Sequence, residues 1–92
     1  MSEFLLIHGA CHAAWAWDRV IPALAAQGHS ARALDLPGRG GHATLDEQAR
    51  AVLDALQGPT VLVAHSAGGF AMTAAAQMDP ALVAGLIYVC AY

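Results

Sequence analysis

In the stretch VLVAHSAGG, residues 61–69, a lone serine follows four apolar residues and a histidine, and small residues follow the serine. The run 61–64 is typical of a buried strand, and the small residues after Ser66 are typical of a sharp turn into a helix. Such a turn places the hydroxyl of Ser66 at the carboxyl end of a parallel sheet, where folds with open parallel sheets bind their ligands. The stretch therefore predicts that Ser66 is a nucleophile that attacks a carbonyl carbon.

The residues around Ser66 are small enough for such a turn. Ala64 and Gly68 stand two positions before and two after it, where larger side chains would collide with the neighbouring strand and helix. His65 is adjacent in sequence, but neighbouring residues at a sharp turn point in different directions, so it is a poor base for Ser66. A serine between a strand and a helix can also be a simple N-cap. The catalytic interpretation is favoured because a second loop supports it.

That second loop is HGACH, residues 8–12, which follows another short apolar run. The free N–H of Ala67, at the start of the predicted helix, would meet negative charge that develops on an attacked carbonyl oxygen. The N–H of Ala10 is the candidate for the second donor, because both strands end at one edge and Gly9 lets the backbone approach closely. His8 is predicted to hold this loop.

Other residues leave alternatives open. Cys11, Trp15 and Trp17 either line an acyl pocket or pack in the core, the more frequent place for aromatic residues at the start of a helix. The remaining titratable residues considered are predicted to be structural or solvated: His29, Asp35, His42, Asp46, Glu47 and Asp54.

Two residue spacings could indicate a cofactor site, one for zinc and one for a dinucleotide, but neighbouring residues argue against both. His8 and His12 are four apart, as in a zinc-binding helix, but Gly9 and the lack of an HExxH glutamate argue against a metal site. The segment 38–43 fits GxGxxA, a dinucleotide-binding spacing. Pro37 interrupts that turn, and the next predicted strand ends without an acid that could bind a ribose. No metal or other cofactor is therefore expected.

Composition limits the class of protein. The chain has 92 residues, 58% hydrophobic and 12% charged, so it is predicted to form one globular domain. A net charge of −3 and only four basic residues argue against nucleic acid as a partner. No segment is long and apolar enough for a signal peptide or a membrane span. Two distant cysteines without a CxxC motif favour a reducing, cytoplasmic setting.

The pattern of apolar residues predicts alternating strands and helices. The first helix has its apolar stripe at positions 17, 20, 21 and 24, and the second starts with a capping box of Thr44 and Glu47. Strands are predicted over 4–7, 30–35, 60–64 and 86–90, and the third helix over 67–78. The order βαβαβαβ predicts a three-layer α/β sandwich with a mainly parallel sheet.

Three motifs resemble the α/β-hydrolase superfamily: LIHGACHAAW, DLPGRGGH and AHSAG, in this order along almost the whole chain. In particular, the sequence is similar to small esterases and hydroxynitrile lyases of the plant methylesterase type. The resemblance implies that Ser66 is the nucleophile and that Ala10 and Ala67 supply the oxyanion-binding amides. Ala64 replaces the first glycine of the family's motif and still fits the turn. His65, Cys11 and Gly68 are expected beside the pocket.

The resemblance also implies that an acid and then a histidine follow Ser66 along the chain. After Ser66 the only acid is Asp79, before Pro80, and there is no histidine. The last predicted strand, 86–90, would form an uncovered hydrophobic edge if nothing followed it. Residues 1–92 are therefore predicted to be the amino-terminal portion of one hydrolase domain, with a cap, further strands and both catalytic partners beyond residue 92.

The sequence thus predicts a serine hydrolase of a small carboxylic ester. Gly9 favours an esterase, because the lyases that the sequence resembles have threonine there. A hydroxynitrile lyase and a non-catalytic relative that binds a small ligand remain alternatives, and a homodimer remains open.

Overall fold

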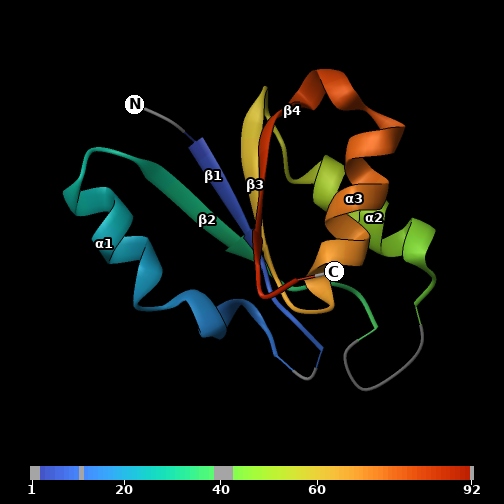
Figure 1. The fold of residues 1–92 in the computed structure, drawn as a ribbon, viewed down its shortest axis with the longest axis horizontal. Coiled ribbons are helices and arrows are strands. Elements are labelled where there is room, and N and C mark those ends of the chain that lie inside the picture. The colour runs from blue at the N-terminus through green and yellow to red at the C-terminus, as the bar shows by residue number, and fades with distance from the viewer. Residues whose placement is uncertain (1–2, 11, 39–42, 92) are drawn as a thin grey trace.

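The computed structural model describes residues 3–10, 12–38 and 43–91. Within these residues, four parallel strands form one sheet in the order β2-β1-β3-β4. The strands are β1 (Glu3–Ile7), β2 (Ser30–Leu34), β3 (Thr60–His65) and β4 (Val83–Val89). Helix α1 (Val20–Ala26) lies on one side of the sheet, and α2 (Leu45–Asp54) and α3 (Gly68–Met78) lie on the other (Figure 1). The predicted α/β sandwich is confirmed.

Two predicted boundaries were wrong. The apolar stripe assigned to the first helix, which begins at Trp17, does not lie in one helix. It is divided between a short 3₁₀ helix, η1 (Ala14–Trp17), and α1. Strand β4 begins at Val83 rather than at residue 86, after a second 3₁₀ helix, η2 (Pro80–Leu82). Its first residues pair with β3 across a register shift between Thr60 and Val61. Neither backbone pairing nor an irregular register can be read from apolar periodicity, and Gly85 interrupts the apolar run.

The two central strands are buried on both faces because helices cover each side. On the α2 and α3 side, Leu5, Ile7 and Leu62 pack in a cluster with Val52 and Met72. On the α1 side, a smaller cluster contains Leu6, Val63 and Trp17. Strands buried on both faces read as continuous apolar runs, which is why β1 and β3 were recognisable in the sequence. Both strands end at the same edge, where the candidate site lies.

Helix α2 is fixed at both ends by hydrogen bonds. The predicted capping box is confirmed: the N–H of Glu47 donates to Oγ1 of Thr44 at 3.1 Å, and the N–H of Thr44 donates to Oε1 of Glu47 at 2.9 Å. Beyond the last turn, Nη2 of Arg32 donates to the carbonyl of Ala55 at 2.7 Å. These bonds satisfy backbone groups that a helix leaves unpaired at its termini.

Strand β4 forms an edge of this sheet and exposes apolar side chains. Leu86, Ile87, Tyr88 and Val89 each have 39–45% of their surface exposed. Ile87 and Tyr88 are adjacent in the strand, so their side chains point to opposite faces of the sheet, and β4 is therefore exposed on both faces. No helix in the described part of the chain is long and apolar enough to cross a membrane.

Candidate active site

Ser66 lies in a tight turn between β3 and α3, which we call the Ser66 turn (residues 65–67). Its φ is +54°, in the left-handed region that residues other than glycine adopt at a cost. The N–H of Ser66 donates to the carbonyl of Val89 at 3.3 Å, and its carbonyl accepts from Gly69 N–H at 3.1 Å. The strained backbone of Ser66 is therefore held by hydrogen bonds on both sides.

Two glycines allow the loop after β1 to lie against this turn. A Cβ added to Gly68 would lie 2.5 Å from the carbonyl oxygen of His8. A Cβ added to Gly9 would lie 3.1 Å from Cβ of Ser66 and 3.1 Å from the carbonyl oxygen of His65. At position 68 the backbone approaches its neighbours more closely than a side chain would allow, and at position 9 a side chain would fit only if the Ser66 turn shifted by a few tenths of an ångström.

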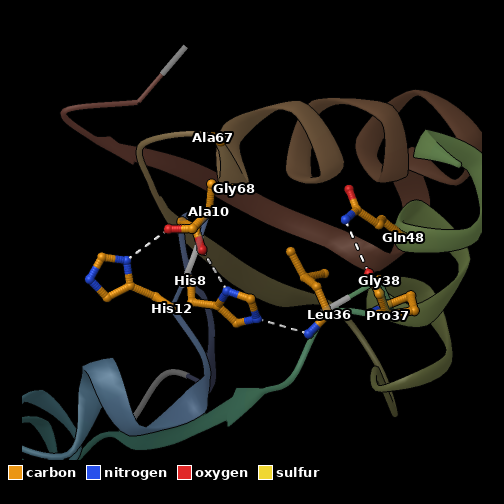
Figure 2. A pocket seen from close by; sticks show the side chains of 10 residues that line it. His8, Ala10, His12, Leu36, Pro37, Gly38, Gln48, Ala67 and Gly68 are labelled. Atoms are coloured by element: carbon orange, nitrogen blue, oxygen red, sulfur yellow. Dashed lines mark hydrogen bonds between the residues drawn. The ribbon is translucent and has the colours of Figure 1, made fainter. Parts of the chain in front are cut away.

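His8 is buried, with 4% of its surface exposed, and both of its ring nitrogens are engaged. Nε2 accepts a hydrogen bond from the N–H of Leu36 at 2.9 Å, and Nδ1 bonds the carbonyl of Gly9 at 2.8 Å (Figure 2). An amide can only donate and a carbonyl can only accept, so these partners assign the proton to Nδ1 and make the ring neutral. His8 thus ties the loop after β1 to the loop after β2.

A cavity of about 220 Å³ opens beside the Ser66 turn (Figure 2). Its walls come from the loop after β1, the loop after β2, one side chain of α2 and the start of α3: His8, Gly9, Ala10, His12, Leu36, Pro37, Gly38, Gln48, Ala67 and Gly68. Ser66 itself is not part of this lining. The cavity does bring together Ala10 and Ala67, the two amides predicted to bind an oxyanion, although they are far apart in sequence.

Two residues at the start of α3, Ala67 and Gly68, line the cavity. The first hydrogen bonds of this region run from Gly69 N–H to Ser66 and from Phe70 N–H to the carbonyl of Ala67 at 3.2 Å. The amides of Ala67 and Gly68 therefore precede the helical ladder, where N–H groups carry partial positive charge. This is an environment that favours a negatively charged oxygen.

His12 is a site residue whose place the sequence analysis did not predict. It lines the cavity, and its Nδ1 donates to the carbonyl of Ala10 at 3.0 Å (Figure 2). Its ring centroid lies 6.0 Å from that of His65, next to Ser66. The sequence offered only the spacing to His8, which was considered as a metal-ligand pair and rejected, and a loop's path cannot be derived from spacing.

The two tryptophans have different environments. Trp17 is 8% exposed and packs with Leu6 and Val63, so it belongs to the core. Trp15 is 57% exposed, and its ring lies 5.4 Å from that of His12. Of the two, only Trp15 lies beside a residue of the cavity.

Other predicted residues are structural or outside the described ranges. Asp35 accepts a hydrogen bond from the N–H of Ala14 at 2.7 Å, which joins η1 to the end of β2. Cys11 and His42 lie outside the described residues, as does most of the glycine-rich segment 38–43.

Asp79 does not lie near Ser66. It follows α3, whose 11 residues place it about 16 Å from the Ser66 turn at the usual rise per residue. Its N–H donates to Ala75 at 3.1 Å, and its carbonyl accepts from Leu82 at 3.2 Å, as expected for a turn. Helix α3 and the turn after it therefore place no carboxylate beside Ser66.

The parallel sheet, the strained serine after β3 and the glycine contacts define the chain as an α/β hydrolase. It belongs to the alpha/beta hydrolase family, whose model matches residues 4–92. It is 41% identical to esterase PIR7B from Oryza sativa subsp. japonica, over 98% of this chain and 38% of that protein. It is 36% identical to methylesterase 7 from Arabidopsis thaliana, over 99% and 40%.

A solved structure shows the same similarity. The pyrethroid hydrolase from Sphingobium faniae JZ-2 superposes with a TM-score of 0.85 at 39% identity, over 98% of this chain and 40% of that chain. The chain spans about two fifths of the length of the relatives it matches.

Proposed function

We propose that this protein is a serine hydrolase that cleaves small carboxylic esters. The observation that carries the proposal is the left-handed Ser66 between β3 and α3, with the backbone of Gly9 packed against its Cβ. The names of the matched relatives, an esterase, a methylesterase and a pyrethroid hydrolase, support hydrolysis of an ester.

In this mechanism, Oγ of Ser66 attacks the ester carbonyl carbon, and the electron pair of the carbonyl moves onto its oxygen. The N–H groups of Ala10 and Ala67 stabilise that oxyanion, which is an interaction strongest in the transition state. A histidine takes the hydroxyl proton and returns it to the leaving alcohol, and water then releases the acid. We place this histidine, its acid partner and a cap in polypeptide that follows residue 92.

Gly9 supports an esterase over a hydroxynitrile lyase. The lyases that the sequence resembles carry threonine at this position, and here a Cβ would already lie 3.1 Å from Cβ of Ser66.

A cytoplasmic setting is also part of the proposal. The exposed free thiol of Cys90 supports it, because such thiols persist where the medium is reducing.

The test is an intact mass spectrum of the protein purified from its natural source organism, before and after incubation with a fluorophosphonate. We expect a mass above that of residues 1–92 and one adduct, which is absent from the Ser66→Ala variant. A protein of the 92-residue mass without an adduct would contradict the proposal. Cyanide release from mandelonitrile without ester hydrolysis would contradict the choice of substrate class.

A further inference from the structure

His12 contacts both halves of the candidate site. Its Nδ1 donates to the carbonyl of Ala10 at 3.0 Å, and its backbone N–H donates to the carbonyl of Gly9 at 3.2 Å. Its ring lies edge-on to that of His65, with centroids 6.0 Å apart and planes at 87°. One residue thus bonds the loop that carries Ala10 and packs against the turn that carries Ser66.

These bonds determine how the Ala10 amide is oriented. The peptide bond between Gly9 and Ala10 is trans, so the N–H of Ala10 points opposite to the carbonyl of Gly9. That carbonyl is held by Nδ1 of His8 and by the N–H of His12. The carbonyl of Ala10, on the other side of the residue, is held by the His12 ring. The peptide group between Gly9 and Ala10 and the carbonyl of Ala10 are therefore both held by hydrogen bonds.

The ring of His12 is itself supported. Trp15 lies against it, with centroids 5.4 Å apart and planes at 48°, and His65 lies at its edge. A ring packed between two others has few alternative rotamers, so its Nδ1 stays directed at the Ala10 carbonyl. Figure 2 shows His8 and His12 each bonded to a carbonyl group of the same loop.

We propose that His12 is a positioning residue, which holds the Ala10 amide in register with Ser66 for binding of the oxyanion. The inference rests on the proposed function. In this role His12 acts through Ala10, because its Nδ1 donates to the carbonyl of that residue. Because an oxyanion donor acts mainly in the transition state, loss of its alignment lowers kcat and leaves KM nearly unchanged.

The test compares three variants of the natural protein, His12→Asn, His12→Gln and His12→Phe, in hydrolysis of a soluble nitrophenyl ester. Asparagine places an amide donor near the position of Nδ1, whereas glutamine carries the same donor one methylene further out, and phenylalanine keeps only the ring. We expect His12→Asn to retain kcat within about threefold. His12→Gln and His12→Phe should lose roughly tenfold in kcat with KM within about twofold, less than removal of a whole oxyanion donor costs.

Equal kcat values for His12→Asn and His12→Gln would overturn the inference, as would a rise in KM at unchanged kcat. Labelling by a fluorophosphonate separates this failure from failure of the proposed function. If the unaltered protein does not react at Ser66, the proposed function falls. If it reacts and the asparagine and glutamine variants react at equal rates, only the role of His12 falls. The Asn and Gln pair differs by one methylene, so a general loss of folding would affect both.

Discussion

The backbone of Gly68, at the start of α3, touches the carbonyl oxygen of His8, at the end of β1: a Cβ added to Gly68 would lie 2.5 Å from that oxygen. The same Cβ would lie 3.0 Å from the carbonyl oxygen of Ile7. Ile7 pairs with Ala64 in β3, so the contact joins the ends of the two central strands to the helix that follows Ser66. The amides of Ala10 and Ala67 are brought to one cavity by this contact.

Gly68→Ala should therefore destabilise the protein. The obstacles are backbone atoms of the last residue of β1 and of the residue after it, which cannot move aside cheaply, so we expect a loss of about 2 kcal/mol, within the usual range for overpacking. Gly58→Ala is the matched control, because a Cβ there meets nothing within 4 Å. Urea unfolding of both variants checks the prediction. Equal urea midpoints for the two variants would show that the close approach at Gly68 does not affect the stability of the fold.

Gly9→Ala should affect the site more than the fold. The added Cβ would lie 3.1 Å from Cβ of Ser66 and 3.3 Å from Nδ1 of His65. To accommodate it, the Ser66 turn must shift by a few tenths of an ångström, and small misplacements of a nucleophile are costly in rate. We expect the rate of fluorophosphonate labelling to fall about tenfold.

The matched control for that substitution is Gly85→Ala in β4, where the added Cβ would lie at an ordinary 3.8 Å from Val61. Labelling at the rate of the unaltered protein is expected for this control. If Gly9→Ala also labels at that rate, position 9 does not determine how Ser66 is placed.

Ser66 stores strain that glycine would release. A left-handed conformation costs a residue with a Cβ about 1–2 kcal/mol. Glycine avoids this strain, but it also loses more conformational entropy on folding, which offsets part of the gain in stability. Ser66→Gly and Ser66→Ala both remove the hydroxyl, so neither should react with a fluorophosphonate. We expect Ser66→Gly to be about 1 kcal/mol more stable than Ser66→Ala in urea unfolding. A more stable alanine variant would mean that φ at position 66 is not strained.

The sequence predicted the layers, and it indicated Ser66 as a candidate site residue, because each has a local signature. Apolar runs marked β1 and β3, Thr44 and Glu47 marked the start of α2, and small residues marked the Ser66 turn. The position of His12 had no such signature. Its ring meets Ala10 and His65 only because two loops from distant segments meet at the sheet edge, and this depends on strand order. The start of β4 was missed for a related reason, since it depends on pairing with β3.

The capping box gives α2 a contribution to stability that depends on pH. Hydrogen bonds from the backbone N–H and the hydroxyl of Thr44 hold the pKa of Glu47 below its ordinary value of 4.5. A lowered pKa in the folded state means that the carboxylate stabilises the fold above pH 4.5, and that this contribution is lost as the pH falls through the lowered pKa.

The Glu47→Gln variant measures this contribution. Glutamine keeps an oxygen acceptor and does not titrate, so its deficit relative to the unaltered protein should be largest near neutral pH and should shrink below pH 4.5. Urea midpoints of both proteins over this range check the prediction. A deficit that stays constant with pH would mean that the charge of Glu47 does not contribute.

Strand β4 leads to a prediction about association of residues 1–92 produced alone. Its apolar side chains are exposed on both faces, and its outer backbone groups face away from β3, which makes the strand a template for pairing. We expect this polypeptide to self-associate with rising concentration in sedimentation velocity experiments. Ile87→Lys, which places a charge in the middle of the edge, should shift the population toward monomer. A polypeptide that stays folded and monomeric at high concentration would show that β4 needs no cover, and would remove this support for further strands beyond residue 92.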